Sequence, residues 1–252
     1  KVPKDFDLAT DATPDVVEDI LKNYRTLGTG KAFGVINVFT KTGDFEIATF
    51  REDIGVGRRP DAVKFTTIEI DVMRRDLTIN ALFYDLSTGE VVDLVGGIDD
   101  LLNGVVRTVG SPAERFGEDP LRKVRAIRFA ARFGVDLSLE TSQAILDNNS
   151  LVGVSKERIH EEFQKGVSSA KSVIFFMELL KKYDLFGQVF PGLDICQRFV
   201  ETRNIPVLLC QLFKFEQTAK VRSILEECKF FKEVDQTVFL HTFSSQLAIE
   251  NA

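Results

Sequence analysis

Cysteine, histidine and tryptophan are scarce in this sequence. Among 252 residues there are three cysteines, two histidines and no tryptophan. Cys196, Cys210 and Cys228 are widely spaced and form no C-x-x-C pair, which argues against a zinc site and against a disulfide framework. Three free thiols are typical of a reducing compartment, so we expect the protein to be cytoplasmic.

Long hydrophobic runs and an excess of positive charge are also absent. The sequence has no run of about 18 apolar residues and no signal-peptide pattern, so we expect a soluble protein without a membrane partner. It carries 38 acidic and 32 basic residues, which give a net charge of −6. The basic residues nevertheless gather at residues 58–64, 74–75 and 118–133, and such local fields allow an acidic chain to bind a polyanion.

Hydrophobic periodicity divides the sequence into a mixed first part and a helical second part. Residues 34–50 alternate like two strands joined by a turn, and residues 74–97 are typical of a short helix followed by a hairpin. Between them, residues 51–65 contain glycine and proline and show little periodicity, which predicts a mobile loop. From Ser138 onward apolar residues recur at helical spacing. We therefore predict an α+β head, a boundary near residues 108–117 and a helical body.

Acidic residues alternate with Phe6 in the segment KDFDLATDATP. In a strand, Asp5 and Asp7 share one face, and Phe6 points the other way, toward the core. Glu46 lies in a second strand, where we expect it to point inward and to need a partner. Hard oxygen ligands of this kind suit Mg²⁺. Three acids on adjoining strands predict a site for two metal ions and a displacement at phosphorus, although a D-x-D pair by itself is also common beside turns.

Arginines dominate residues 118–133. Asp119 and Pro120 suit the start of a helix, where a negative charge is favourable. One side of the helix collects apolar residues: Val124, Ala126, Ile127, Ala130 and Ala131. Another side collects four arginines: Arg122, Arg125, Arg128 and Arg132. A solvated basic face explains such a pattern in an ordinary surface helix. The choice of arginine over lysine indicates instead that the helix binds planar edges or phosphates, because only a guanidinium donates two parallel hydrogen bonds.

Five motifs resemble, in order and approximate spacing, those of the class II tRNA nucleotidyltransferase and bacterial poly(A) polymerase family. They are KDFDLATDATP, FEIATFRED, RRDLTINALFYD, DLVGGIDDLLNGVVRTVG and EDPLRKVRAIRFAARF. The resemblance is strong over residues 1–190 and weak beyond them. It implies a polymerase-β-like nucleotidyltransferase head, with a mixed sheet and helices, in residues 1–110. A helical neck in residues 111–168 and a helical body in residues 169–252 would follow.

The resemblance implies a metal-dependent transfer in the head. Asp5 and Asp7 would bind Mg²⁺, and Glu46 would be a third acid of the same site. The family also has a Gly-Gly and Arg-Asp segment that closes on the triphosphate, and the printed sequence starts after its position. In relatives that make complete CCA ends, a loop equivalent to residues 51–66 reshapes the pocket for ATP. The resemblance therefore implies that this loop matters more for adding A than for adding C.

Residues of the RRD motif are implied to bind the nucleotide. Arg75 would meet the triphosphate and Asp76 the ribose, and Asn80, one helical turn on, would face the same way. A surface ion-pair cluster is the other interpretation of these charges. The Gly-Gly pair at residues 96–97 stands where the family has a flexible connector, and it is equally typical of a plain exit from a hairpin.

In the family the arginine helix selects the nucleotide. Asp119 offers only acceptors, and Arg122 offers only donors. Cytosine and adenine present an amino donor beside a ring-nitrogen acceptor, whereas guanine and uracil present the opposite order. The pair therefore fits C and A, and each group left unsatisfied by G or U costs about 1–3 kcal/mol. Arg125 and Arg128 would extend the row of donors toward the triphosphate or the RNA 3′ end.

Three functions are compatible with these motifs. The first is template-independent addition of C and A to the 3′ end of tRNA, from CTP and ATP, by a monomer or weak homodimer. A poly(A) polymerase, which adds AMP to RNA, is similar in every quoted motif. The third is a nucleotide- or RNA-binding protein without catalysis, which the intact acids of the head disfavour. Residues 190–252 carry no functional motif, and we expect most of the 22 phenylalanines to serve packing.

Overall fold

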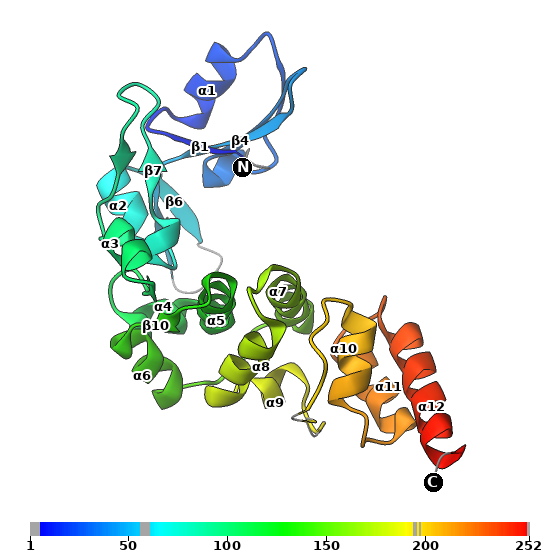
Figure 1. Ribbon diagram of the computed structural model, residues 1–252. Coiled ribbons are helices and arrows are strands. Elements are labelled where there is room, and N and C mark those ends of the chain that lie inside the picture. Colours follow the sequence, from blue (N-terminus) through cyan, green and yellow to red (C-terminus); the bar gives the residue numbers. More distant parts are fainter. Residues whose placement is uncertain (1–5, 56–60, 194–195, 197, 251–252) are drawn as a thin grey trace. The chain divides into compact units, whose positions relative to one another are not determined.

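The structure is a computed structural model that describes residues 6–55, 61–193, 196 and 198–250, the side chains of residues 245–250 excepted (Figure 1). The chain forms two compact units, Lys1–Gly97 and Ile98–Ala252. The first unit ends at Gly97, before residue 110, where the sequence predicts the end of the head. The predicted limits at residues 110 and 168 stay predictions. A mixed-sheet head followed by a helical region confirms the predicted α+β class.

A four-stranded mixed sheet forms the head. Its order is β1 (Asp7–Thr10), β4 (Asp44–Thr49), β3 (Val35–Phe39) and β2 (Arg25–Leu27). β1 pairs with β4 in parallel, and the other pairs are antiparallel. β3 and β4 confirm the two strands predicted in residues 34–50, because the alternation there gives each strand one consistently apolar face.

Helix α1 (Pro14–Ile20) covers one face of this sheet. Val17 of the helix packs with Ile36 and Val38 of β3, and Ile47 of β4 adds to the same small core. Since side chains alternate along a strand, the residues between these positions are turned to the opposite face. That opposite face carries Asp7 and Glu46, two of the acids predicted for the metal site.

Two hairpins complete the head. β5 (Arg51–Ile54) pairs antiparallel with β6 (Ala62–Phe65), so the expectation of a loop throughout residues 51–65 is wrong. These strands are short and carry several charges, and the pairing between them, rather than any periodicity, stabilises them. The pair of β7 and β8 confirms the second predicted hairpin. The remaining elements of the head are η1 (Lys31–Phe33), α2 (Ile68–Met73), η2 (Thr78–Asn80), β7 (Phe83–Tyr84) and β8 (Val91–Val92).

The second unit is helical apart from one parallel pair of two-residue strands in its described part, which the sequence did not predict. The helical character from Ser138 onward is confirmed. Its elements are α3 (Gly97–Leu102), β9 (Val105–Val106), α4 (Pro112–Glu118), α5 (Leu121–Phe133), β10 (Asp136–Leu137), α6 (Leu139–Asp147), α7 (Lys156–Ser169), α8 (Val173–Lys182), α9 (Phe186–Val189), α10 (Ile205–Leu212), α11 (Thr218–Glu227) and α12 (Val234–Glu250).

Helix α5 is the centre of the second unit and packs against α4, α7 and α8. The apolar residues predicted to share one side of this helix are all fully buried. The helix begins at Leu121, with Pro120 at the N-cap, so its start lies one residue later than predicted. Gly134 ends it in the left-handed region, with φ of 68°, which a glycine adopts without strain.

Phenylalanines build much of the core of this unit. Phe163 lies against Phe190 and Phe230, with ring centroids 5.0 Å and 5.9 Å away, and Phe190 and Phe230 are 5.1 Å apart. All three are buried. The prediction that aromatic residues serve packing is confirmed for this cluster.

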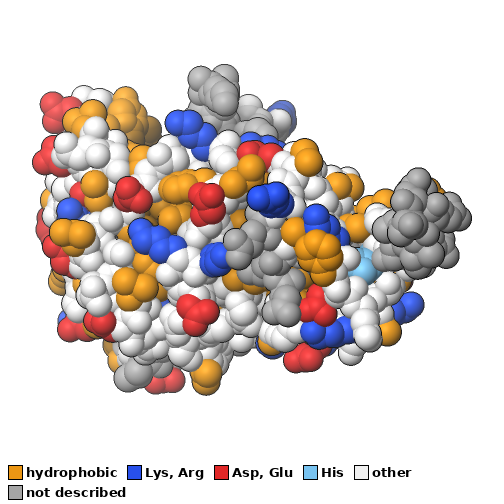
Figure 2. All heavy atoms as spheres, turned by 60° about the horizontal axis from the view of Figure 1, so that its bottom comes forward, with side chains coloured by type: hydrophobic (Ala, Val, Ile, Leu, Met, Phe, Trp, Pro, Cys, Tyr) orange, Lys and Arg blue, Asp and Glu red, His pale blue; other side chains and the backbone are white. Residues whose placement is uncertain are grey.

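The face drawn in Figure 2 carries mixed charge. On this face (Figure 2), lysine and arginine side chains lie among acidic and apolar ones and form no continuous basic patch. The helices that the structure describes include none with the length and apolarity needed to cross a membrane.

Candidate active site

Two of the predicted acids are neighbours on the face of the head sheet opposite α1. Asp7 of β1 is the register partner of Glu46 of β4, and Glu46 is in turn the partner of Asn37 of β3. Both carboxylates are exposed. Among the described residues, neither has a hydrogen-bond or ion-pair partner. Two adjacent anions without a counter-charge in this part of the chain make a favourable place for a cation.

Two predicted orientations in this region are wrong. Glu46 does not point inward, because Ile47 and Phe45 occupy the core side of β4 and Glu46 takes the accessible side. Phe6 is 51% exposed instead of buried. It precedes the first paired residue of β1, and the core beneath α1 is filled by other apolar side chains.

The donors present fit Mg²⁺ by their chemistry. Carboxylate oxygens on adjoining strands are the hard ligands that this ion prefers. Asp5, the other predicted ligand, lies outside the described residues. Within the described residues no group of three or more acidic, histidine or cysteine side chains is placed to hold a metal. The fit therefore rests on Asp7 and Glu46, and the complete ligand set stays a prediction.

The RRD motif places its three predicted nucleotide-binding residues together. Nη1 of Arg75 donates to the backbone oxygen of Asn80 at 3.2 Å, and Nδ2 of Asn80 donates to Oδ1 of Asp76 at 3.2 Å. The Arg75 guanidinium also lies over the ring of Phe83, 4.4 Å from its centroid. Burial lowers the pKa of Arg75, which the neighbouring Asp71 counteracts, and an arginine stays charged at neutral pH.

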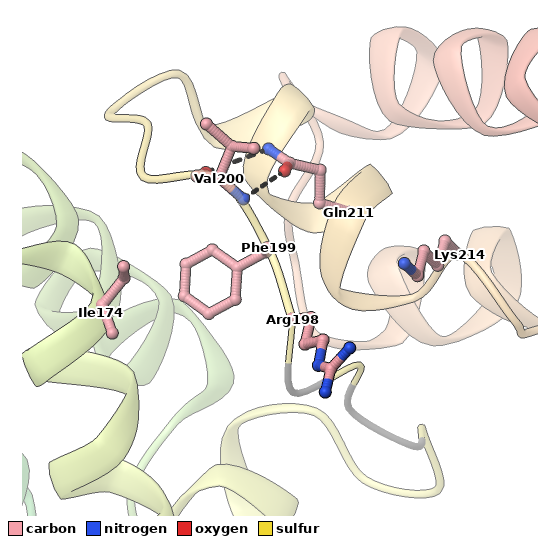
Figure 3. A pocket seen from close by; sticks show the side chains of 6 residues that line it. All are labelled: Ile174, Arg198, Phe199, Val200, Gln211 and Lys214. Atoms are coloured by element: carbon pink, nitrogen blue, oxygen red, sulfur yellow. Dashed lines mark hydrogen bonds between the residues drawn. The ribbon is translucent and has the colours of Figure 1, made fainter.

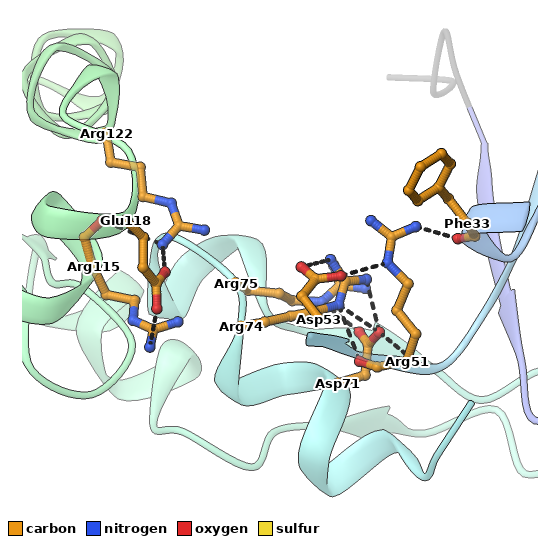
Figure 4. Close-up of polar contacts among 9 residues, drawn as sticks. All are labelled: Phe33, Arg51, Asp53, Asp71, Arg74, Arg75, Arg115, Glu118 and Arg122. Carbon is orange, nitrogen blue, oxygen red and sulfur yellow. Dashed lines mark hydrogen bonds and ion pairs between the residues drawn. The ribbon is translucent and has the colours of Figure 1, made fainter. Parts of the chain in front are cut away.

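Asp71 holds this motif from inside and was not predicted. It is only 1% exposed and accepts hydrogen bonds from Arg51, Arg74 and Arg75 (Figure 4). Asp71 precedes the two arginines by three and four residues, the spacing at which side chains meet on a helix. That spacing is a signal from which the ion pairs could have been predicted.

The Gly-Gly pair after β8 is packed against the same motif. The Asp93 carboxylate accepts the backbone N–H groups of Val95, Gly96 and Gly97 at 2.9–3.1 Å. A Cβ on Gly97 would lie 2.3 Å from the backbone oxygen of Thr78, so only glycine fits there. The turn that carries Asn80 thus touches the end of the first unit directly. Whether this segment bends during catalysis stays a prediction.

At the start of α5, the Asp119 carboxylate is held by a partner that sequence reasoning missed. Arg158 of α7 donates to both oxygens, with Nη1 3.2 Å from Oδ1 and Nη2 2.5 Å from Oδ2. Oδ1 also accepts the N–H of Leu121 at 3.2 Å. The ion pair joins residues 39 positions apart, so no local spacing signals it. It fixes the carboxylate in one orientation at the end of the helix.

Arg122 is oriented by the preceding helix. It pairs with Glu118, whose other oxygen is 2.7 Å from Nη2 of Arg115, and it also donates to the backbone oxygen of Arg115 at 3.3 Å (Figure 4). Asp119 and Arg122 are three residues apart, and each is held by a different partner, Arg158 and Glu118. That Asp119 and Arg122 select the base stays a prediction.

The two arginines further along α5 face α7. Nε of Arg128 lies 2.7 Å from Glu162, and Nη1 of Arg125 lies 3.5 Å from the same carboxylate. Arg128 is 7% exposed, so the alternative interpretation, a solvated basic face, does not hold for this residue. The helix is covered on more than its apolar side, because α7 and α8 both pack on it. The predicted contact of Arg128 with the triphosphate or RNA stays a prediction.

Lys123 is a buried charge that the sequence did not single out. Its ammonium donates to the backbone oxygen of Ser150 at 2.8 Å and to Oδ1 of Asn148 at 3.5 Å. Burial lowers the pKa of this lysine. The contacts tie the α6–α7 loop to α5 and so help to fix the helix that carries Asp119 and Arg122.

A separate pocket of about 520 Å³ lies in the second unit (Figure 3). It is lined by Ile174, Arg198, Phe199, Val200, Gln211 and Lys214. Gln211 closes one side through hydrogen bonds with the backbone of Val200 at 2.7 Å and 3.3 Å. No acidic side chain is among these lining residues, and nothing in the sequence of this region signalled a pocket.

Two family models match the chain. The model described as "Poly A polymerase head domain" matches residues 1–107, and "Probable RNA and SrmB- binding site of polymerase A" matches residues 134–196. The chain belongs to the class II CCA-adding enzyme and poly(A) polymerase family. The first match covers the sheet of the head, and the second covers β10 and helices α6 to α9. Its members are nucleotidyltransferases, and the family resemblance found in the sequence is confirmed.

Relatives from both branches of the family match the chain. The CCA-adding enzyme of Bacillus licheniformis is 37% identical over 224 residues, covering 87% of this chain and 53% of the relative. That of Enterococcus faecalis is 36% identical over 248 residues, covering 93% and 60%. Poly(A) polymerase I of Escherichia coli O157:H7 is 36% identical over 221 residues, covering 82% and 46%. The chain thus spans about half the length of the curated relatives it matches.

Solved structures of family members share the fold. A Bacillus stearothermophilus CCA-adding enzyme in complex with CTP superposes with a TM-score of 0.78 at 28% identity, over 98% of this chain and 62% of that one. A CCA-adding enzyme with ATP gives 0.73 at 21% identity, over 94% and 60%. The second likeness concerns the fold alone.

Proposed function

We propose that this chain is the nucleotidyl-transferring part of a CCA-adding enzyme, which extends the 3′ end of tRNA with C and A from CTP and ATP. The observation that carries the proposal is the pair at the start of α5. There the carboxylate of Asp119 is held by Arg158, and the guanidinium of Arg122, three residues later, is held by Glu118. The acceptor–donor order matches C and A and mismatches G and U.

The head would carry out the transfer. The RNA 3′-hydroxyl attacks the α-phosphorus of the incoming nucleotide, the bond to the β-phosphate breaks, and pyrophosphate leaves. Asp5 and Asp7 would hold Mg²⁺ with Glu46 as the third acid, and the bound ions would neutralise the charge that develops on the phosphate oxygens. Arg75 would bind the triphosphate, while Asp76, held by Asn80, would accept from the ribose.

Base choice would be a property of α5. Asp119 would accept the exocyclic amino group, and Arg122 would donate to the neighbouring ring nitrogen. Arg125, and Arg128 once released from Glu162, would extend the donors toward the triphosphate or the RNA end. The bonds to Arg158 and Glu118 support this assignment, because each holds its side chain in a defined orientation before a base binds.

The direct test is to incubate the chain with Mg²⁺, all four NTPs and a tRNA lacking its 3′ CCA, and then to sequence the products. CCA ends are expected. An oligo(A) tail would favour the second candidate, a poly(A) polymerase. The 36% identity to the Escherichia coli enzyme supports this candidate. No extension by this chain would contradict both.

The metal site gives the first prediction. Asp5→Ala and Asp7→Ala should each lower the rate of nucleotide addition at least about a hundredfold, because each removes one ligand of the metal clamp. Single-turnover addition of CMP to tRNA measures this. Asp11→Ala, which alters a neighbouring acid in the same segment, is the control. Turnover close to the wild type in both variants would rule out this site.

A further inference from the structure

We propose that Asp71 positions Arg75 for the triphosphate and joins it to the β5–β6 hairpin, so that hairpin and phosphate-binding guanidinium act as one unit. The inference rests on the proposed function for the role of Arg75. The connection between Arg75 and the hairpin rests on the contacts of Asp71 alone. Those contacts converge on one buried carboxylate from two elements (Figure 4).

The first oxygen of Asp71 holds the hairpin and Arg74. Oδ1 accepts the backbone N–H of Arg51, the first residue of β5, at 3.0 Å. The same oxygen accepts Nε and Nη2 of Arg74 at 3.0 Å and 2.7 Å. Arg74 in turn donates to the backbone oxygen of Arg51 at 3.2 Å. Three donors therefore meet at Oδ1: the N–H of Arg51, and Nε and Nη2 of Arg74, which belongs to the RRD motif.

The second oxygen of Asp71 faces Arg75. Oδ2 accepts Nε of Arg75 at 3.3 Å. The remaining contacts of this guanidinium are the carbonyl of Asn80 at 3.2 Å and the ring of Phe83 at 4.4 Å. Within the described part of the chain, Nη2 of Arg75 has no hydrogen-bond partner, and the side chain is 29% exposed. One edge of the guanidinium is thus fixed, and the other is left to meet an anion.

Charge explains why a carboxylate is needed here. Burying an acid is unfavourable unless cationic donors surround it, and Asp71 has two guanidinium groups beside it. Asp71 shares its single negative charge between the guanidinium groups of Arg74 and Arg75, so it is not the counter-ion of Arg75 alone. Asp71 therefore orients the arginine without cancelling its attraction for phosphate. It touches no substrate atom in this scheme and is a positioning residue.

The substitution Asp71→Asn separates the two contacts. An amide has one acceptor oxygen, and three donors converge on Oδ1 against one on Oδ2. The amide oxygen should therefore stay with Arg51 and Arg74, and the NH₂ group should turn to Arg75, where two donors would face each other. Asp71→Ala, by contrast, removes both contacts.

The experiment measures binding of CTP and of cytidine to the full chain with Mg²⁺, by titration calorimetry, together with hydrogen exchange at the Arg51 amide. Asp71→Asn should weaken CTP at least about tenfold, change cytidine less than about twofold, and leave the Arg51 amide protected. Asp71→Ala should weaken CTP and also expose that amide to exchange. In an Arg75→Ala background, Asp71→Asn should add less than about a twofold effect.

A matched control removes an equal charge from the same cluster. Asp53 contacts Arg51 at 3.0 Å and Arg74 at 4.0 Å, and Arg75 has no contact with it. Asp53→Asn should change the affinity for CTP less than about threefold.

Equal losses of CTP and cytidine, or wild-type affinity for CTP in Asp71→Asn, would overturn the positioning role. Unchanged exchange at the Arg51 amide in Asp71→Ala would overturn the joint with the hairpin. A wild-type chain that binds no triphosphate would contradict the proposed function and the nucleotide half of this inference together. Hydrogen exchange at the Arg51 amide would still test whether Asp71 holds the β5–β6 hairpin.

Discussion

At the scale of single residues, the surroundings of an aspartate carboxylate decide whether it suits metal binding or a fixed structural contact. Asp7 is exposed and has no cationic partner among the described residues, which suits a metal ligand. Asp119 is held at both oxygens by Arg158, and Asp71 is enclosed by arginines. A carboxylate that must move with its ligand stays open, and one that must keep a fixed orientation is braced by a guanidinium.

Asp119→Ala should weaken discrimination against UTP and GTP and also lower the rate. The acceptor for the base amino group would be lost, so a misplaced carbonyl would no longer meet a repelling oxygen, while Arg122 would still donate. We expect the ratio of CTP to UTP incorporation to fall by about tenfold or more, since one unsatisfied group costs about 1–3 kcal/mol. Single-nucleotide addition with each NTP measures it.

Arg122→Lys is the companion to this substitution. It should be nearly as damaging as Arg122→Ala, because a point donor cannot reproduce the planar fork. Wild-type behaviour of Arg122→Lys, or full preference for C and A in Asp119→Ala, would reduce these residues to helix-start and surface groups.

At the scale of elements, the β5–β6 hairpin is attached to the RRD motif, although the sequence predicts a loop there. Deleting residues 54–58 should therefore leave CC-ended products, because the relatives imply that this segment matters for accepting ATP after two C additions. Sequencing the products of a tRNA lacking its CCA end checks this. Equal loss of C and A addition would mean that the hairpin only supports the fold of the head.

One buried acid of α7 pairs with two arginines of α5. Glu162 is 4% exposed and lies 2.7 Å from Arg128 and 3.5 Å from Arg125. Glu162→Gln keeps the size but leaves the buried Arg128 without a negative partner, which should lower the free energy of unfolding by about 2–4 kcal/mol. Urea denaturation of the full chain measures it.

The control for this prediction is an exposed ion pair. Glu226 lies 3.0 Å from Arg222 on α11, and both side chains are about half exposed. Glu226→Gln should leave the unfolding midpoint unchanged within error. Equal effects of the two substitutions would show that the Arg128 ion pair does not stabilise the helix packing.

At the scale of the whole second unit, one histidine links stability to pH. His160 of α7 stacks on Phe230 with centroids 3.8 Å apart, and its Nε2 lies 3.6 Å from Glu233. Burial lowers the pKa of His160 below its ordinary value of about 6.5, and Glu233 only partly opposes this. The unfolded chain therefore binds the proton more readily than the folded chain does.

The sign of the effect follows from that difference. The stability from neutral His160 is fully present above about pH 6.5 and is lost as the pH falls through the lowered pKa of the folded state. Its slope is at most about 1.4 kcal/mol per pH unit. His160→Gln should flatten this dependence between pH 7.5 and pH 5, measured by urea denaturation of both proteins. Identical pH profiles would contradict the prediction.

Local sequence was sufficient wherever a structure depends on neighbours along the chain. The alternation in residues 34–50 determines a hairpin, and the apolar spacing between Val124 and Ala131 determines the buried side of α5. The RRD motif brings Arg75, Asp76 and Asn80 together because they are at most five residues apart. Each of these follows from strand or helix geometry alone.

Only the tertiary structure decided which charges are buried and what holds them. Arg158 meets Asp119 across 39 positions, and Glu162 meets Arg128 across 34. Such pairs depend on how α7 packs on α5, which the spacing within either helix does not contain. The same holds for β5 and β6, whose short strands pair with each other, and for the bond between Arg51 of β5 and Asp71. Motifs in the sequence determine the chemistry available to this protein, and long-range packing selects the side chains that remain accessible to perform it.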